Sequence, residues 1–383
     1  MDEVLARAQA LFESYETLVR SELPAGAAVV DVHTHLGHDI DGMIGDFDEL
    51  TKIQERTCVS RSIVFCLDEP DRHPAFRAAN DRTLAFGARS EGRLVPFVRL
   101  DLGERPIEEA TRCLDLGARG IKLHPRAQKF LLDDDRLAPV FELAADRKVP
   151  ILIHGGRGLP PIADALARLV DRYEATLIIA HAGIADLAAL AHHFSGRPGV
   201  FFDTSVWSAL DLLDLYRLVA PEQVLYASDY PYGSQPGSLY VALRTAKLSN
   251  LDDERLRAML GASANRILDG APPLPLSQPV GLTDVATPIT FARIHQYLSM
   301  ATPLLWTRQA DSIGVLGLAL NACDERSNGH REDTARIREL LLAARDLWRL
   351  LPETEGEAEL RRVARTAFRL LHLANVVTVT AHA

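Results

Sequence analysis

Eight short apolar runs recur between residues 28 and 229, and their spacing constrains the fold more than any other feature of the chain. Each run is rich in Val, Ile or Leu and is followed by a helical pattern; the runs are 28–33, 62–67, 94–100, 120–124, 149–154, 176–181, 200–204 and 224–229. Successive runs start 24 to 34 residues apart, which is the interval of a repeated strand–helix unit. Such continuous apolar strands are typical of parallel sheets that are buried on both faces.

Eight strand–helix units predict an α/β fold, a (β/α)8 TIM barrel over residues 24–270, because this fold needs about 250 residues. A doubly wound open sheet is the alternative. That sheet would carry a glycine-rich fingerprint after its first strand, and the residues that follow here, DVHTHLG, contain no GxGxxG. The barrel is therefore the favoured interpretation.

The rest of the chain divides into three further segments. Residues 1–23 form an amphipathic helical pattern, residues 271–283 form a Pro-rich linker, and residues 284–383 form a C-terminal helical segment. Pro-rich sequence of this kind is too constrained for helix. Apolar stripes at helical spacing in 334–350 and 357–373 must be buried, so we expect these helices to pack on the barrel exterior or across a homodimer interface.

Charge and composition exclude several classes of protein. The formal net charge of −10 gives no electrostatic footprint for nucleic acid. No apolar run approaches the roughly 18–20 residues of a membrane helix, and the N-terminus lacks a signal-peptide core. The four cysteines are scattered without a CxxC pair, as in a reducing cytoplasm. We expect a cytoplasmic protein that takes a small-molecule substrate, with no nucleic-acid or membrane partner.

Residues able to bind metal stand where the predicted strands end: His33, His35, His124, His154, His181 and Asp229. Active sites of barrels are built at the C-terminal ends of their strands. His33 and His35 are two residues apart, so both side chains point to one side of an extended chain. Singly, a strand-end histidine is more often a satisfied core residue, and Asp229 could be a helix cap. Together they predict a site for Zn²⁺ or another divalent ion.

The same residues carry a resemblance to a known family. Asp31-Val-His-Thr-His35, Gly120-Ile-Lys-Leu-His-Pro125, Ile151-Leu-Ile-His154, Ile178-Ile-Ala-His-Ala-Gly183 and Ser228-Asp-Tyr-Pro231 resemble the amidohydrolase superfamily. They are similar in particular to its amidohydrolase-related branch, which includes aminocarboxymuconate-semialdehyde decarboxylase-like enzymes. The resemblance implies one divalent metal, Zn²⁺ by preference, on His33, His35, His154 and Asp229. It also implies catalytic roles for His181, as acid/base or polarising group, and for Asp229, as proton acceptor.

Lys122 leaves the number of metals open. In two-metal branches of that superfamily a carboxylated lysine on strand four bridges the ions, and Lys122 resembles that residue. The alternative is a lysine that pairs with a barrel carboxylate such as Asp31 or Asp203, since an unpaired charge inside an apolar strand is costly. The single-metal interpretation is favoured, with Lys122 as a ligand only if a second ion binds.

Other polar residues after the strands are candidates for substrate binding: His124, Arg126, Arg157 and Arg99. Guanidinium groups that converge on a metal site suit a substrate carboxylate, which arginine holds bidentately. An ordinary solvated position is about equally compatible with each arginine in a chain so rich in this residue.

Three functions follow from this sequence. The first is a metal-dependent hydrolase that uses a metal-bound hydroxide on a small substrate carrying a carboxylate. The second is a non-oxidative decarboxylase, a lyase, on the same metal barrel. The third is a non-catalytic scaffold that keeps its metal for stability.

Overall fold

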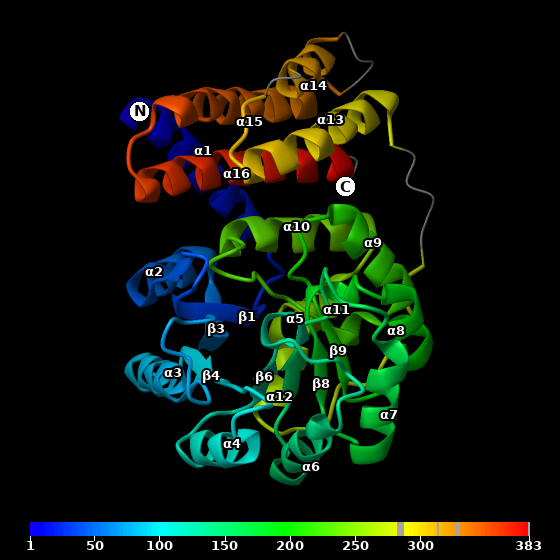
Figure 1. Cartoon of the computed structure of the whole chain (residues 1–383). Helices are drawn as coiled ribbons and strands as arrows, with labels where there is room; N and C mark the ends of the chain where they lie inside the picture. The colour runs from blue at the N-terminus through cyan, green and yellow to red at the C-terminus, as the bar shows by residue number, and fades with distance from the viewer. Residues whose placement is uncertain (282–286, 312–313, 326–329, 382–383) are drawn as a thin grey trace. The chain divides into compact units, whose positions relative to one another are not determined.

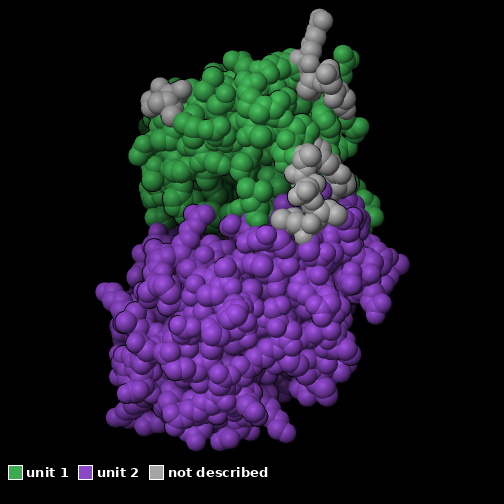
Figure 2. Space-filling model, turned by 90° about the vertical axis from the view of Figure 1, so that its right-hand side faces the viewer, with its two compact units in different colours: residues 1–21, 207–210, 282–383 green, residues 22–206, 211–281 purple. Residues whose placement is uncertain are grey.

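The computed structural model describes residues 1–281, 287–311, 314–325 and 330–381. Figure 1 shows a mixed α/β part and a purely helical part. The chain divides into two compact units (Figure 2): residues 22–206 with 211–281 form the α/β unit, and residues 1–21, 207–210 and 282–383 form the helical unit. The N-terminal segment thus groups with the C-terminal helices and not with the barrel.

The strands of the α/β unit fall into two sheets, with the orders β2-β1-β3-β4 and β10-β9-β8-β7-β6-β5. All pairs are parallel except the short β1–β2 hairpin. The strands are β1 (Val29–His38), β2 (Ile44–Gly45), β3 (Val59–Cys66), β4 (Leu94–Pro96), β5 (Val98–Arg99), β6 (Ile121–Leu123), β7 (Ile151–Ile153), β8 (Leu177–Ile179), β9 (Val200–Asp203) and β10 (Val224–Leu225).

The two sheets close into one barrel through backbone hydrogen bonds at both seams. At the first seam Phe97 interrupts the predicted strand 94–100, and its N–H donates to Val64 at 2.8 Å while the next N–H, on Val98, bonds to Gly120 in the other sheet. At the second seam the N–H of Val32 donates to Tyr226 at 3.0 Å. Counting β4 and β5 as one bent strand gives eight parallel strands, and the predicted TIM barrel is confirmed.

Helices follow the strands and form the outer layer, in which α3 packs on α4, α4 on α6, α6 on α7 and α7 on α8. They are α2 (Phe47–Thr57), α3 (Arg77–Arg89), α4 (Pro106–Asp115), α5 (Pro125–Gln128), α6 (Ala138–Arg147), α7 (Ala163–Tyr173), α8 (Leu187–Phe194), α9 (Ala209–Leu218), α10 (Gln235–Leu248), α11 (Asp253–Arg257) and α12 (Ser263–Leu268). Apolar side chains from seven strands, among them Val32, Leu152, Ile178 and Phe201, form one buried cluster. Because side chains fill the barrel interior, the polar residues of the same strands gather at the strand ends.

The helical unit consists of α1 (Asp2–Glu22), α13 (Ile289–Trp306), α14 (Val315–Asp324), α15 (Arg331–Leu350) and α16 (Glu357–Thr380). α16 packs against α15 and α13, and α14 packs against both α13 and α15. Residues 271–281 form no helix or strand, and residues 282–286, at the predicted boundary of linker and helices, lie outside the described residues. Among the described helices none is both long and apolar enough to cross a membrane.

Candidate metal centre

Two histidines of β1 and one aspartate after β10 bring their donor atoms together. His35 Nε2 lies 3.2 Å and His33 Nε2 3.3 Å from Asp229 Oδ1. β1 continues to His38, so the histidine pair lies within the strand, on one face. Asp229 adopts a left-handed backbone with φ 56°, and its N–H donates to the His33 carbonyl at 2.9 Å. This bond between the first and last strands holds the carboxylate beside both imidazoles.

The charges and unpaired atoms of this cluster fit a divalent metal. Burial lowers the pKa of His33 and His35. Burial acts to raise the pKa of Asp229, but the His33 charge and the His35 hydrogen bond lower it overall. Neutral imidazoles and an ionised carboxylate are the forms that bind metal. His35 Nδ1 and His154 Nδ1 are buried without a hydrogen-bond partner among the described residues, a cost that a bound ligand relieves.

We expect the metal content of the protein to stay constant between about pH 7.5 and about pH 6.0. An ordinary histidine, with a pKa of 6.5, becomes protonated in this interval and releases metal. Burial keeps His33 and His35 neutral below that pH, so protons compete less well with the metal for the ring nitrogens. Metal analysis after dialysis at each pH checks this, and loss of half of the metal by about pH 6.0 would contradict the lowered pKa values.

Asp203, at the end of β9, orients the first ligand. Its Oδ2 accepts a hydrogen bond from His33 Nδ1 at 2.8 Å. Because His33 Nδ1 carries the proton, its Nε2 presents a lone pair beside Asp229. A carboxylate such as that of Asp203 is the usual second partner of a metal-bound histidine. Asp203 was considered from the sequence only as a partner of Lys122. The signal that could have found it is the strand-end position that singled out Asp229.

Ser205 fixes the orientation of His181, the predicted acid/base. His181 Nδ1 lies 2.9 Å from the Ser205 carbonyl oxygen, and a carbonyl can only accept. His181 Nδ1 therefore carries the proton, and in the neutral ring Nε2 is a proton acceptor. The backbone N–H of His181 donates to Asp203 Oδ1 at 2.8 Å. His33, His181 and Asp203 form a second group of potential ligands that shares His33 with the first.

The other two predicted histidines lie beside His181. The rings of His124 and His154 stack at 4.0 Å, and His154 meets His181 edge-on at 4.7 Å. Burial lowers the pKa of His154 to about 2. The described ligand groups do not include His154, so the structure brings three of the four predicted ligands together and places the fourth next to the acid/base. His124 Nδ1 accepts the Ala127 N–H at 3.2 Å and caps α5.

Lys122 is buried beside His33, with Nζ 3.5 Å from His33 Nε2 and 4.6 Å from the centre of the Phe65 ring. Burial lowers its pKa to about 7, although the charges of Asp203 and Asp229 act to raise it. Its Nζ forms no ion pair within 4.0 Å with any described carboxylate. A role as a second-metal ligand stays a prediction.

Asp31, the other carboxylate considered for Lys122, holds the loop that carries Asp229. Its oxygens accept from the Ser228 N–H at 2.9 Å, the Ser228 hydroxyl at 2.6 Å and Gln235 Nε2 at 2.8 Å. The proposed pairing of Lys122 with Asp31 is therefore wrong. The first and last strands of the barrel are joined by this buried network.

The three predicted arginines lie in different environments. Arg99 is 2% exposed and is the register partner of Lys122, so both side chains point to the same side of the sheet. Lys122 in turn reaches His33 of the metal centre, with its Nζ 3.5 Å from His33 Nε2. Arg126 and Arg157 are exposed.

Only some of the donors of the Arg99 guanidinium have a partner. Nη1 donates to the Cys66 carbonyl at 3.2 Å, and Nη2 is 3.9 Å from Asp68 Oδ1. Arg99 Nε has no hydrogen-bond partner among the described residues. A buried guanidinium with spare donors can receive an anion.

The chain matches the family model described as Amidohydrolase over residues 30–270. A candidate amidohydrolase from Staphylococcus aureus has 18% identity and a TM-score of 0.51, over 63% of this chain and 99% of that one. A candidate 2-pyrone-4,6-dicarboxylic acid hydrolase from Acinetobacter baumannii, with citric acid bound, has 12% identity and a TM-score of 0.51 over the same shares. 2,6-Dihydroxybenzoate decarboxylase from Rhizobium has 17% identity and a TM-score of 0.50, over 64% and 98%. No curated protein matches the chain.

Proposed function

This chain belongs to the amidohydrolase family, and from that premise we propose that it is a hydrolase acting on a small substrate that carries a carboxylate. The observation that supports the proposal most strongly is the convergence of His33 and His35 on Asp229. Buried Arg99 stands on the neighbouring strand in register with Lys122. The same fold hosts hydrolases and decarboxylases, so the choice of reaction rests on the site and not on the fold.

His33, His35 and Asp229 would hold the divalent ion, with His154 as a further candidate. When bound, such an ion polarises a substrate oxygen and lowers the pKa of water to about 7. The residues of the chain then supply proton transfer. His181 Nε2, held as an acceptor by the Ser205 carbonyl, takes a proton from the attacking water and returns it to the leaving group. Asp229 is the second acceptor, since its neighbours keep it ionised.

Arg99 is the reason for proposing a substrate that carries a carboxylate. A carboxylate at the strand ends would receive hydrogen bonds from the spare guanidinium donors and would neutralise a buried charge that Asp68 meets only at 3.9 Å. Charge-assisted bonds of this kind are the strong ones in proteins.

We expect Arg99→Met to raise KM for carboxylate substrates by about tenfold or more, the scale of one lost hydrogen bond to a charged group. The value of kcat should fall less, because the proton-transfer residues are unchanged. Steady-state kinetics with a carboxylate substrate and with its neutral amide analogue check this. An equal change for both compounds would show that Arg99 does not bind the carboxylate.

Product analysis tests the reaction itself. The metal-loaded protein is incubated with carboxylate-bearing lactones and amides and, separately, with aromatic carboxylic acids. Ring opening or release of an amine supports the hydrolase. Release of CO2 from an aromatic acid without hydrolysis would identify the decarboxylase, and turnover of neither class, with metal bound, would favour the scaffold.

A further inference from the structure

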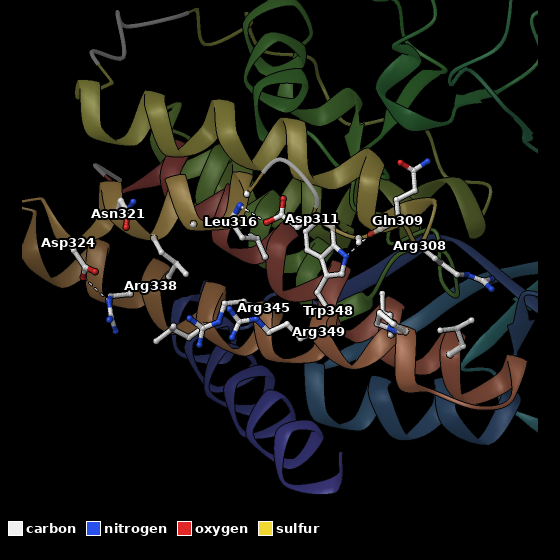
Figure 3. A pocket seen from close by; sticks show the side chains of 18 residues that line it. Arg308, Gln309, Asp311, Leu316, Asn321, Asp324, Arg338, Arg345, Trp348 and Arg349 are labelled. Carbon is white, nitrogen blue, oxygen red and sulfur yellow. Dashed lines mark hydrogen bonds and ion pairs between the residues drawn. The ribbon is translucent and has the colours of Figure 1, made fainter.

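The helical unit contains a cavity of about 890 Å³, separate from the barrel chemistry (Figure 3). Its described lining comes from residues 308–311 and 314, from α14 and α15, from residues 351–352, and from Leu360 near the beginning of α16. This volume lies in the range of small-molecule sites, roughly 300–1,000 Å³.

One wall of the cavity is apolar. Leu316 and Leu320 of α14 and Leu342 and Trp348 of α15 line it. The Trp348 indole N–H donates to the Gln309 carbonyl at 2.7 Å, so the polar group of this side chain is satisfied within the protein. The rest of the indole is a fixed apolar surface.

Arginines line the same cavity from one side of α15. Arg338, Leu342, Arg345 and Arg349 follow one another at intervals of three or four residues, which places them on one face of the helix. Figure 3 shows these arginine side chains in succession along α15. The cavity therefore joins an apolar wall to a row of cations, in a chain whose net charge is −10.

Four arginines line the cavity, and they differ in their partners. Arg308, which precedes α14, pairs with Glu357 at 2.9 Å. Arg338 Nε bonds to Asp324 at 2.7 Å, and Arg345 Nη2 bonds to the adjacent Asp346 at 2.9 Å. Arg349 has no ion-pair partner among the described residues. The remaining acid of the lining, Asp311, accepts the first N–H groups of α14 with both oxygens. The cavity thus keeps one cation available for an anion.

Gly317 stands at the lining of the cavity. It lies inside α14, and a β-carbon added to it would meet no atom within 4 Å. Glycine inside a helix is less favourable than alanine. Gly317 is exposed, so a larger side chain can be placed at this edge of the cavity without a clash at its β-carbon.

We propose that this cavity binds an aliphatic monocarboxylate, with the carboxylate on Arg349 and the hydrocarbon chain along the leucines and Trp348. Guanidinium groups hold carboxylates bidentately, and the apolar wall gives a hydrocarbon chain the burial that a small inorganic anion cannot use. The proposal does not depend on the function of the barrel.

Calorimetric titration of the full chain with decanoate, below its micelle-forming concentration, tests the proposal. The wild-type protein should bind decanoate saturably. Arg349→Gln should weaken binding about tenfold, the scale of a lost charge-assisted contact. Gly317→Phe should abolish binding by filling the cavity, while its thermal melting confirms the fold. Arg336→Gln is the matched control on α15, because Arg336 is exposed, pairs with Glu332 and does not line the cavity.

Two further comparisons show which part of decanoate is recognised and which site of the protein binds it. Decanol lacks the charge and inorganic phosphate lacks the chain, so each should bind at least about tenfold more weakly than decanoate. Arg99→Met removes the carboxylate site proposed in the barrel and should leave this binding intact. Binding that persists in folded Gly317→Phe, binding lost in Arg99→Met, absence of wild-type binding, or equal affinity for phosphate would each overturn the proposal.

Discussion

Asp229→Asn is expected to abolish turnover, by about 10³-fold or more, and to lower the metal content of the purified protein. The carboxylate meets His33 and His35 at 3.3 Å and 3.2 Å and supplies the negative charge of that ligand group. An amide of the same shape keeps the volume and loses the charge that favours a divalent cation. Metal stabilisation of a reaction is worth several kcal/mol, which sets the scale of the loss.

The measurement combines metal analysis with kcat for the same preparation. Asp48→Asn is the matched control, because Asp48 is exposed on α2 and has only a 3.8 Å pair with Arg89. Asp229→Asn with a full complement of metal would remove this residue from the ligand set. Loss of metal with undiminished turnover would leave the scaffold interpretation and the proposed mechanism both without support.

His181→Asn is expected to lower kcat by about 10²-fold or more, the usual scale of a general acid–base group, while bound metal is retained. The reason is the tautomer set by the Ser205 carbonyl, 2.9 Å from His181 Nδ1, which leaves Nε2 as the group that moves a proton. Asparagine can still reach a nearby acceptor but cannot take up a proton.

Metal content and the pH dependence of kcat distinguish this role from a structural one. A proton-transfer residue leaves its pKa in the pH profile, and the variant should lose that limb. His192→Asn, an exposed change on α8, serves as the control. If His181→Asn loses metal together with activity, His181 is a ligand, and the group that it forms with His33 and Asp203 becomes the preferred site for a second ion.

The sequence predicts the barrel well because its signal is local. Every barrel strand is a short apolar run, and eight runs at regular intervals leave few alternatives. The details that depend on distant residues could not be predicted. The third strand breaks at Phe97 because that N–H bonds to Val64, and β1 extends to His38 because β2 pairs with its end.

The candidate site follows the same division. Residue type and predicted position alone pointed to His33, His35, His181 and Asp229, although His33 and His35 lie within β1 and not at its end. Type and position could not assign Asp203 its hydrogen bond to His33 Nδ1, since the two residues are 170 positions apart. They likewise could not place His154 beside His181 and outside the described ligand groups. The cavity of the helical unit has no sequence signature, because it depends on how α14, α15 and α16 pack together.

The hydrogen bond between His35 and Asp229 spans 194 positions of the chain, and this separation has a consequence for synthesis. The ligands come from the first and last strand–loop units, so a growing chain that lacks its eighth unit holds the imidazoles without their carboxylate. Contacts of such long range form late, after the cost of closing the loop has been met. The complete metal site is therefore formed only after the whole barrel has folded. A metal that binds only the native state would stabilise that state against unfolding.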